Sequence, residues 1–419
     1  MLSSKIISVG DEILIGQIVN TNAQFISEKL YSIGIPVKKI NTIGDNEDAL
    51  LTELDDSVRN YDVTVITGGL GPTHDDITKP ILIKYFEDEL VNDEKVLRHV
   101  KSIFVNRNIK MPDVNYGQAM VPKKSKVIWN GMGTAPGIWI EKNNKIIIAL
   151  PGVPFEMKAM IKDSVLPMLI DKFTDKLDYV IKSRTVLTTG IGESSLSELI
   201  GDVKLLIGED KMAFLPTLYG VRLRIDVKRS SLEEVEERLN VIENSLRKKI
   251  EKYIFGTDDD LLEQKTGELL LFNKLTLSVA ESCTGGLLSS KITDISGSSE
   301  YFKGGICTYS NESKIALLSV ERKTIDNYGA VSEETALEMA ENVRKKFGSD
   351  IGLSTTGIAG PSGGNMAKPV GLVWIGYSDG KKTYAKKFLF GNNRERTKIR
   401  SAYQALAILK KEISNLLNN

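Results

Sequence analysis

The chain has 419 residues, with 55 basic and 55 acidic side chains, so its formal net charge at pH 7 is zero. This balance excludes a generally basic nucleic-acid coat, although it leaves room for a local patch. Its hydrophobic share of 41% and charged share of 26% are ordinary for a soluble folded protein and exclude wholesale disorder. Two cysteines and two histidines supply neither a disulfide framework nor a histidine-rich metal site, so any metal would be held mainly by oxygen.

The N-terminal segment does not have the pattern of a signal peptide, because Asp11 and Glu12 interrupt its apolar stretch at once. The longest apolar run, Ile146–Leu150, is the length of a strand and far shorter than the ~18–20 residues of a membrane span. We therefore expect a cytoplasmic protein that does not enter a membrane. At roughly 100–200 residues per domain, the length predicts two to four domains.

The first 174 residues alternate apolar runs of strand length with helical patterns. Such alternation needs crossover connections, so it predicts a mostly parallel sheet with helices on both faces. A hairpin is expected to extend this sheet, which gives a three-layer α/β domain at residues 1–174. The predicted elements are strands at Lys5–Gly10, Val37–Ile43, Val63–Thr67, Ile138–Glu141 and Lys145–Leu150, and helices at Asn20–Ile33, Glu47–Arg59 and Pro154–Phe173.

Residues 175–256 predict a small α+β module, and Gly256–Asp260 is predicted to be the linker after it. Over residues 257–419 the alternation returns and predicts a second three-layer α/β domain. The module's predicted elements are strands at Tyr179–Thr188 and Val221–Val227 and helices at Ser194–Ile200 and Ser231–Ile250. Those of the last domain are helices at Leu261–Asn273, from Thr284, at Ser332–Phe347 and at Asn393–Leu417, and extended segments at Thr276–Ala280, Gly304–Tyr309, Ile351–Thr355, Gly371–Tyr377 and Lys382–Leu389.

Three segments of the first domain follow predicted strands and could bind a ligand. Ligands of an open parallel sheet sit beyond the carboxyl ends of its strands, and glycines there let backbone N–H groups approach phosphate oxygens. Acidic side chains in these segments could hold a hard cation. A plainer interpretation is that the glycines form ordinary turns and that Asp75 and Asp76 cap a helix. The segments are Gly10–Glu12 with Gly16, Asn20 and Asn22, then Thr67–Asp76, and Leu150–Met157.

Together, GDEILIGQIVNTN, TGGLGPTHDD and LPGVPFEM resemble the molybdopterin-binding-like domain of the CinA family of competence/damage-inducible proteins, through the whole first domain. The resemblance implies an ADP-ribose pyrophosphatase that forms AMP and ribose 5-phosphate and depends on a divalent cation. It also implies the site residues, with phosphate held by Gly68, Gly69, Gly71, Pro72 and Thr73 and the metal handled by Asp11, Asp76 and Glu156.

The middle module resembles the KH-like domain of full-length CinA proteins. An RNA-binding KH domain clamps the nucleotide backbone with a G-x-x-G loop. The candidate loop here, Gly190–Glu193, reads G-x-G-E and lacks that motif. The module is therefore predicted to be structural, as a spacer or a dimer element, and no direct contact with nucleic acid is expected.

The segment Ala280–Gly286 (AESCTGG) follows a predicted strand and opens a helix, so Ser282 should lie beside helix N-terminal amides. Neither histidine lies in this domain, which excludes a Ser–His–Asp triad. Ser282, Tyr309 and Lys314 could form an amidase set, because a lysine of lowered pKa can take a proton and a tyrosine can relay one. Two alternatives stay open: Ser282 as a helix cap with Lys314 on the surface, and Cys283 as nucleophile or as a buried apolar residue.

ESCTGG, TYSNESK, TGIAGPSGG, KPVGLVWIG and the arginine-bearing last helix are similar to the nicotinamide mononucleotide deamidase domain of CinA, over residues 261–415. The resemblance implies hydrolysis of nicotinamide mononucleotide to nicotinic acid mononucleotide and ammonia, without a metal. It makes Ser282 the nucleophile and gives its proton to Tyr309 and Lys314. Substrate, oxyanion or phosphate would be held by Thr284, Gly285, Gly286, Thr356, Gly357, Arg396 and Arg400.

Both implied substrates derive from NAD, so the resemblance implies a bifunctional enzyme that salvages NAD breakdown products. The alternative is a regulatory or competence-related partner protein whose sites bind nucleotides without turning them over. The resemblance also suggests a homodimer.

Overall fold

The computed structural model describes residues 2–73, 75–177 and 179–417, so His74 of the glycine-rich segment lies outside the described residues. The chain divides into two compact units, Met1–Lys182 with Lys228–Glu236, and Ser183–Val227 with Glu237–Asn419. Across the described ranges, no helix has both the length and the apolar composition that a membrane crossing requires.

The first unit is built on a six-stranded sheet with the strand order β2-β1-β3-β8-β7-β6. The first four of these strands are parallel, and β7 and β6 add to them in antiparallel fashion, so the predicted hairpin does extend a mostly parallel sheet. The strands are β1 (Ser4–Val9), β2 (Val37–Ile43), β3 (Val63–Thr67), β6 (Lys126–Ile128), β7 (Gly137–Lys142) and β8 (Lys145–Leu150).

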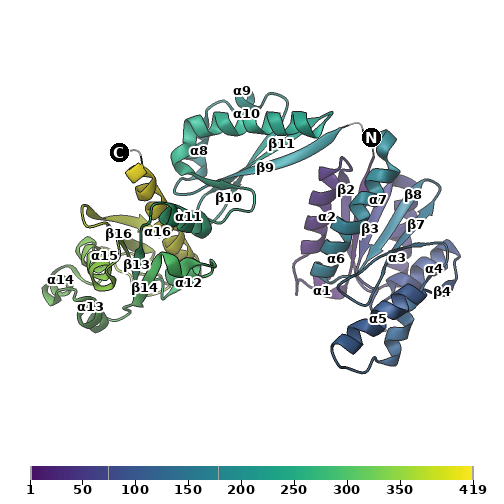
Figure 1. Cartoon of the computed structure of the whole chain (residues 1–419), viewed down its shortest axis with the longest axis horizontal. Helices are drawn as coiled ribbons and strands as arrows, with labels where there is room; N and C mark the ends of the chain where they lie inside the picture. Colours follow the sequence, from purple (N-terminus) through teal and green to yellow (C-terminus); the bar gives the residue numbers. More distant parts are fainter. Residues whose placement is uncertain (1, 74, 178, 418–419) are drawn as a thin grey trace. The chain divides into compact units, whose positions relative to one another are not determined.

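Helices cover both faces of this sheet and give the predicted three layers (Figure 1). Ile26 and Met157 pack on one face, and Leu50 and Leu82 pack on the other. A π-helical turn at Ile161–Val165 divides the single long helix that the sequence predicts after β8. The helices are α1 (Asp11–Leu14), α2 (Thr21–Ser32), α3 (Glu47–Asn60), α4 (Thr78–Phe86), α6 (Pro154–Met160) and α7 (Leu166–Lys172).

Between β3 and β7 the structure contains elements that the sequence analysis did not predict. Three strands there have only three residues each, too few for an alternating pattern to be recognised. Helix α5 packs its buried Val96 and Val100 against Ala119 in a small separate core. Besides α4 and β6, the elements are β4 (Leu90–Asn92), α5 (Glu94–Asn106), a 3-10 helix at Asp113–Ala119 and β5 (Met120–Pro122).

The middle module has a four-stranded sheet in the order β10-β11-β9-β12, beside which α10 lies (Figure 1). The predicted linker is wrong in its first two residues, because Gly256 and Thr257 belong to β12 and pair with β9. The chain turns at Asp260, whose carboxylate accepts from the Thr257 N–H at 2.9 Å. The elements are β9 (Val180–Thr188), α8 (Glu193–Ile200), α9 (Val203–Ile207), β10 (Lys211–Pro216), β11 (Val221–Arg229), α10 (Leu232–Ile250) and β12 (Ile254–Thr257).

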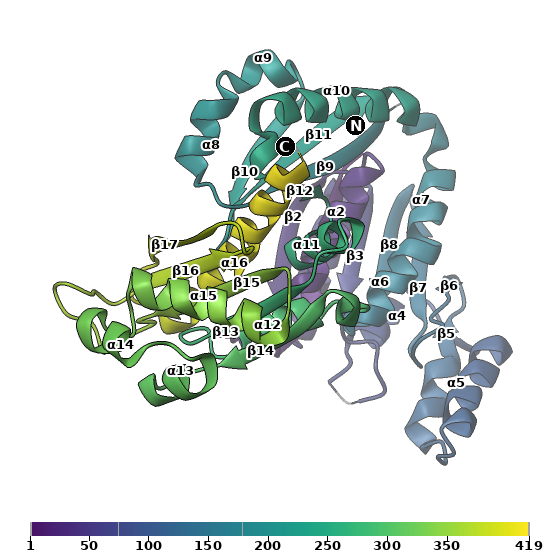
Figure 2. The same ribbon diagram turned by 60° about the vertical axis from the view of Figure 1, so that its left-hand side comes forward.

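The last domain has a five-stranded sheet in the order β14-β13-β15-β16-β17, with β14, β13 and β15 parallel and the other two strands antiparallel. Helices α11, α12 and α16 bury one face, and α15 lies on the other (Figure 2). Its elements are α11 (Leu262–Phe272), β13 (Leu277–Glu281), α12 (Leu287–Thr293), β14 (Phe302–Cys307), α13 (Asn311–Leu318), α14 (Arg322–Tyr328), α15 (Glu333–Phe347), β15 (Ile351–Gly357), β16 (Leu372–Ser378), β17 (Thr383–Leu389) and α16 (Arg394–Leu417).

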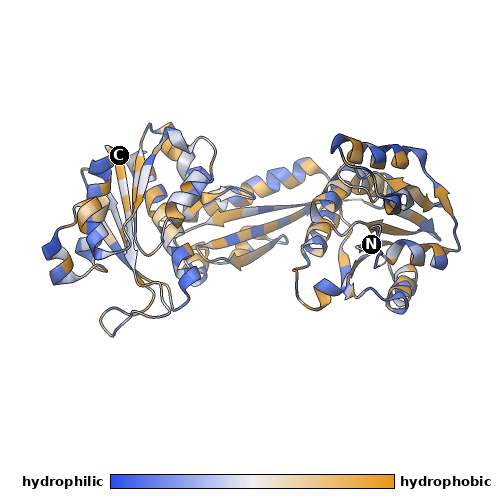
Figure 3. Cartoon of the chain, turned by 90° about the horizontal axis from the view of Figure 1, so that it is seen from below, coloured by the Kyte–Doolittle hydropathy of each residue, from blue (hydrophilic) through white to orange (hydrophobic). Residues whose placement is uncertain are grey.

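In both α/β domains buried apolar residues form cores between sheet and helices. The strands of the first unit are largely orange in Figure 3, and those of the last domain are more mixed. The helix predicted from Thr284 begins later, at Leu287, because Gly285 and Gly286 adopt φ angles of 62° and 94°. These left-handed conformations suit glycine and end the strand in a turn before the helix starts.

Candidate functional site

Ser282 is the first residue after β13 and is 7% exposed. Its N–H donates to the Thr355 carbonyl of the neighbouring strand β15 at 2.9 Å, so the sheet itself fixes its backbone. The N-cap of α12 is Gly286, which makes no side-chain cap bond. The interpretation of Ser282 as a helix cap is therefore wrong.

Lys314 lies in the first turn of α13 and is 1% exposed, so it is not a surface lysine. A capping box starts this helix, with Ser310 Oγ accepting from the Ser313 N–H at 3.1 Å. Lys314 Nζ lies 3.0 Å from Ser282 Oγ and donates to the Thr308 carbonyl at 2.8 Å. Burial lowers the pKa of Lys314 from its usual 10.5, which favours the neutral amine that can accept a proton.

Cys283, the residue after the serine, is buried, at 5% exposure. Burial raises the pKa of its thiol to about 12, so the reactive thiolate is scarce at neutral pH. Of the two interpretations left open for this residue, the structure agrees with the buried apolar one.

A buried carboxylate occupies the amides at the start of α12. Glu281, the last residue of β13, is 0% exposed and precedes the serine directly. The sequence analysis quoted this residue but gave it no role. Its carboxylate accepts four hydrogen bonds, from the N–H groups of Gly286 (3.0 Å), Leu288 (3.0 Å) and Ser289 (2.8 Å) and from Ser289 Oγ (2.7 Å).

The prediction that the amides of Thr284, Gly285 and Gly286 all face substrate is therefore wrong for two of them. The Gly286 N–H is bound by Glu281, and the Gly285 N–H donates to the Ser282 carbonyl at 3.1 Å. The Thr284 N–H donates to no backbone carbonyl in the part of the chain that the structure describes.

The hydroxyl of Tyr309, the third member of the predicted amidase set, is bound by an arginine. Tyr309 is 61% exposed, and its hydroxyl accepts from Arg394 Nη2 at 2.6 Å. Arg394 also donates to the Gly360 carbonyl at 3.0 Å, so it joins the segment after β14 to the loop after β15. The sequence analysis missed Arg394, because nothing in the spacing distinguishes it from Arg396 two residues later.

The strand-end threonines use their hydroxyls within the fold. Thr356 Oγ1 donates to the Ala330 carbonyl at 2.6 Å, and Thr284 Oγ1 lies 2.7 Å from Thr355 Oγ1. The Thr356 hydroxyl is thus engaged within the fold, and its predicted part in holding substrate or oxyanion stays a prediction. Gly357 allows a close approach of strands, since a Cβ there would lie 2.6 Å from the Leu372 carbonyl oxygen.

The cations of α16 divide between two roles. Arg400, predicted to bind substrate, donates instead to the Leu218 carbonyl at 3.1 Å and thereby holds the middle module. Arg396 is exposed in the first turn of the helix. Lys398 was missed, although its Nζ would lie 3.6 Å from a Cβ on Gly285 of the serine turn. Its position four residues after Arg394, on the same helical face, is the signal that could have found it.

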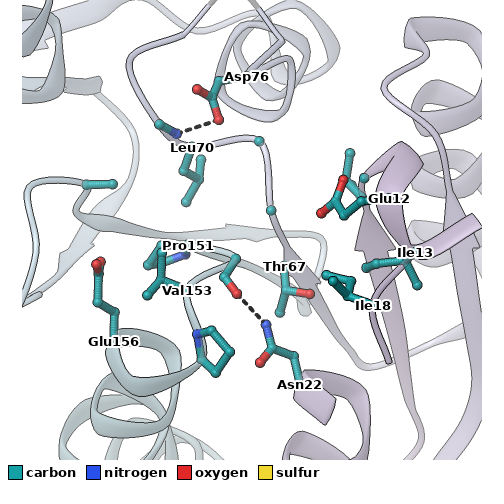
Figure 4. A pocket seen from close by; sticks show the side chains of 18 of the residues that line it. Glu12, Ile13, Ile18, Asn22, Thr67, Leu70, Asp76, Pro151, Val153 and Glu156 are labelled. Atoms are coloured by element: carbon teal, nitrogen blue, oxygen red, sulfur yellow. Dashed lines mark hydrogen bonds between the residues drawn. The ribbon is translucent and has the colours of Figure 1, made fainter. Parts of the chain in front are cut away.

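In the first unit, a cavity of about 580 Å³ lies at the carboxyl ends of β1, β3 and β8 (Figure 4). All three predicted segments line it, so the structure brings them together as expected. Asn22 Nδ2 donates to the Gly152 carbonyl at 2.7 Å and so joins the first segment to the third. Gly68 is required by close approach, since a Cβ there would lie 2.3 Å from the Val9 carbonyl oxygen.

The phosphate cradle predicted in this cavity is partly wrong, because Asp76 binds its own loop. Its carboxylate accepts from the Gly71 N–H at 2.7 Å and from Thr73, by the N–H at 2.8 Å and by Oγ1 at 2.5 Å. The Gly68 N–H donates to the Leu150 carbonyl, and Pro72 has no N–H to offer. The Gly69 N–H donates to no backbone carbonyl within the described ranges.

The predicted metal ligands Asp11, Asp76 and Glu156 do not form one group. Over residues 2–73, 75–177 and 179–417, no three acidic, histidine or cysteine side chains are placed to hold a metal ion. Asp76 is occupied by its loop, and Glu156 accepts from Asn130 Nδ2 at 2.7 Å. The structure therefore does not bring these three carboxylates together, and their role as metal ligands stays a prediction. A cation here would need phosphate oxygens and water for most of its shell, as is usual for Mg²⁺.

Asp45 is an acidic residue of the cavity that the sequence analysis missed. It lines the cavity, and its carboxylate accepts from the Asp11 N–H at 3.3 Å. Burial, together with the charges of Asp11 and Glu12, raises the pKa of Asp45 above its usual 3.8. Its place just after the strand Val37–Ile43 is the signal that could have found it.

Family models match three parts of the chain: a probable molybdopterin binding domain over residues 5–171, a damage-inducible protein CinA KH domain over 183–256, and a CinA C-terminal domain over 259–413. These matches define a three-domain class of protein with a molybdopterin-binding-like domain. The boundaries at residues 174 and 256 stay predictions.

The chain is 45% identical over 410 residues to a putative competence-damage inducible protein of Caldicellulosiruptor bescii, covering 98% of this chain and 99% of that one. It is 43% identical over 416 residues to a CinA-like protein of Chloroherpeton thalassium, covering 97% and 98%. The chain belongs to the CinA family of competence-damage inducible proteins. The resemblance found in the sequence motifs is thus confirmed.

Proposed function

We propose that the last domain hydrolyses the carboxamide of nicotinamide mononucleotide, giving nicotinic acid mononucleotide and ammonia. The observation that carries this proposal is the 3.0 Å distance between Lys314 Nζ and Ser282 Oγ, with both side chains buried. A serine becomes a nucleophile only beside a base, and a buried, neutral lysine is a base that needs no histidine.

The reaction follows from this pair. Ser282 Oγ attacks the carboxamide carbon while its proton passes to Lys314 Nζ. Lys314 then returns that proton to the leaving nitrogen, so ammonia departs and an ester of Ser282 remains. Water, deprotonated by Lys314, attacks the ester and releases the carboxylic acid, and the serine regains its proton. No metal takes part in these steps.

Other groups around the turn are suited to bind the rest of the substrate. The Thr284 N–H, left without a backbone acceptor in the described structure, is suited to the developing oxyanion. Lys398 beside Gly285 and the exposed Arg396 supply positive charge for the nucleotide phosphate.

An ammonia-release assay with nicotinamide mononucleotide tests the proposal directly. Wild-type protein should release one ammonia for each nicotinic acid mononucleotide formed, and Ser282→Ala should release none above the blank. A regulatory protein that only binds nucleotides would release none in either form, which would overturn the proposal.

For the first domain we propose hydrolysis of ADP-ribose to AMP and ribose 5-phosphate with a divalent cation. The support is a cavity at the strand ends, lined by glycines and by acidic residues that include Glu12 and Asp45. Chromatography of the products from ADP-ribose tests this proposal. Intact ADP-ribose after prolonged incubation with Mg²⁺ and with Mn²⁺ would overturn it.

A further inference from the structure

Glu281 is a fully buried acidic residue, and among the residues that the structure describes it accepts an unusually large number of hydrogen bonds. It is 0% exposed at the end of β13, and its two carboxylate oxygens accept the four hydrogen bonds described above. Burying a charge without partners is costly, so a fully buried carboxylate needs donors of this number and quality. The donors come from the turn and the first residues of α12.

These hydrogen bonds join residues that lie on either side of Ser282 in the sequence. Glu281 lies directly before Ser282, and its partners Gly286, Leu288 and Ser289 lie five to eight residues after Glu281. The carboxylate therefore closes the chain from residue 281 to 289 into a loop around its own side chain. Its charge also balances the partial positive charge of the helix start. Two of the residues in between, Gly285 and Gly286, are glycines in left-handed conformation, which would leave the turn easily deformed without this closure.

We propose that Glu281 is the positioning residue of the serine turn: its carboxylate holds residues 282–289 so that Ser282 Oγ stays within reach of Lys314 Nζ. This inference rests on the proposed amidase function. Glu281 touches no reacting atom in the proposed reaction and acts only through the turn. It also explains why the start of α12 does not supply the oxyanion site, because the carboxylate already occupies those amides.

A matched control variant is needed to distinguish a positioning role of Glu281 from a purely structural one. Glu412 is a second buried carboxylate of the same domain, 7% exposed on α16. It accepts from Lys382 Nζ at 3.1 Å and from Tyr384 Oη at 2.8 Å, and neither partner belongs to the serine turn. Glu281→Gln and Glu412→Gln both replace a buried carboxylate with an amide, so both should lower the melting temperature. Only the first should change the reactivity of the serine.

The experiment compares full-length wild type, Glu281→Gln and Glu412→Gln by two readouts. The first is kcat and KM for ammonia release. The second is the rate at which a fluorophosphonate labels Ser282, in which Oγ bonds to phosphorus, fluoride leaves and Lys314 takes the proton. We expect Glu281→Gln to lower kcat and the labelling rate about 10–100-fold with KM within about threefold, as for misplaced groups in active sites. Glu412→Gln should keep both rates within about twofold.

Each other outcome has a definite meaning. A Glu281→Gln protein that labels and turns over within twofold of wild type, or that loses no more than Glu412→Gln, would overturn the positioning role. Labelling without ammonia release in the wild type would sink the amidase proposal alone, and the labelling rates would still judge Glu281. If Glu281→Gln does not fold, Glu281→Asp keeps the charge but shortens the side chain, and an unchanged labelling rate in that variant would equally overturn the role.

Discussion

The two α/β domains each place a glycine-rich turn at the carboxyl end of a parallel strand. In each domain, a carboxylate close to the turn in sequence accepts hydrogen bonds from the turn's N–H groups. Asp76 binds the N–H groups of Gly71 and Thr73, and Glu281 binds those of Gly286 and the residues after it. The turns differ in what faces them. The first opens on a cavity of about 580 Å³ with acidic walls, whereas the second presents a buried serine to a buried lysine.

The comparison teaches that a glycine-rich turn is not by itself a phosphate site. In both domains, amides that the motif offers to a ligand are used to stabilise the loop that carries them. What a turn does chemically is decided by the residue that a different element brings to it. For Ser282 that residue is Lys314 from α13.

The largest expected effect is the loss of activity at the second turn, with the activity of the first site unchanged. Ser282→Ala should lower ammonia release by about 10³-fold or more while nicotinamide mononucleotide still binds within a few-fold, because a hydroxyl adds little to binding of the ground state. Lys314→Ala should lower the rate of ammonia release by about as much. The double variant Ser282→Ala/Lys314→Ala should lower it no further, since nucleophile and base act as a unit. Additive losses in the double variant would contradict the pair.

Removal of divalent cations by a chelator should abolish the activity of the first site and leave that of the second site unchanged. We expect EDTA to abolish cleavage of ADP-ribose, because phosphate charge must be neutralised there and the cavity walls are acidic. Ammonia release should stay within about twofold, since the serine and lysine need no metal. Added Mg²⁺ should restore the first activity. Equal sensitivity of both activities to EDTA would refute this division.

The pH dependence should sharpen the difference between the sites. Ammonia release requires neutral Lys314, so kcat/KM should fall about tenfold per pH unit below the pKa of that lysine and level off above it. Because burial lowers this pKa from 10.5, the plateau should begin at lower pH than for an exposed lysine. The profile of kcat/KM against pH checks this, and a rate still climbing through pH 10.5 would argue against Lys314 as the base.

Asp76→Asn should loosen the first turn without touching the second. The substitution weakens hydrogen bonds from Gly71 and Thr73, and leaving such donors poorly paired costs about 1–3 kcal/mol. We expect a weaker affinity for ADP-ribose by about tenfold, measured by calorimetry, with ammonia release unchanged. Undiminished affinity would show that Asp76 does not shape the cavity.

The smallest effect concerns Cys283. Cys283→Ala should keep ammonia release within about twofold, because the thiol is buried and its pKa of about 12 leaves little thiolate. A dead Cys283→Ala enzyme beside an active Ser282→Ala enzyme would move the nucleophile by one residue.

Helices and strands long enough to show a pattern of apolar residues were largely predictable from sequence. The predicted strands Val37–Ile43 and Val63–Thr67 agree with the structure to the residue. The short strands β4 and β5 were not predictable, because three residues carry no readable alternation.

The candidate site was predictable only as far as local motifs reach. Ser282 and Lys314 could be proposed as a pair, but only the fold shows that a capped helix buries the lysine beside the serine. The amides bound by Glu281, and the contact of Arg394 with Tyr309, depend on side chains that fold back or cross between elements. Sequence spacing does not record such contacts.

The central claim, that Ser282 is the nucleophile of an amide hydrolysis, is tested most directly by trapping its ester. Wild-type protein mixed with nicotinamide mononucleotide and quenched in acid within its first turnovers is digested and mapped by mass spectrometry. The account predicts that the peptide containing Ser282 gains the mass of nicotinamide mononucleotide less ammonia, and that Ser282→Ala shows no such adduct. Ammonia released at the wild-type rate by Ser282→Ala, or an adduct on Cys283, would contradict it.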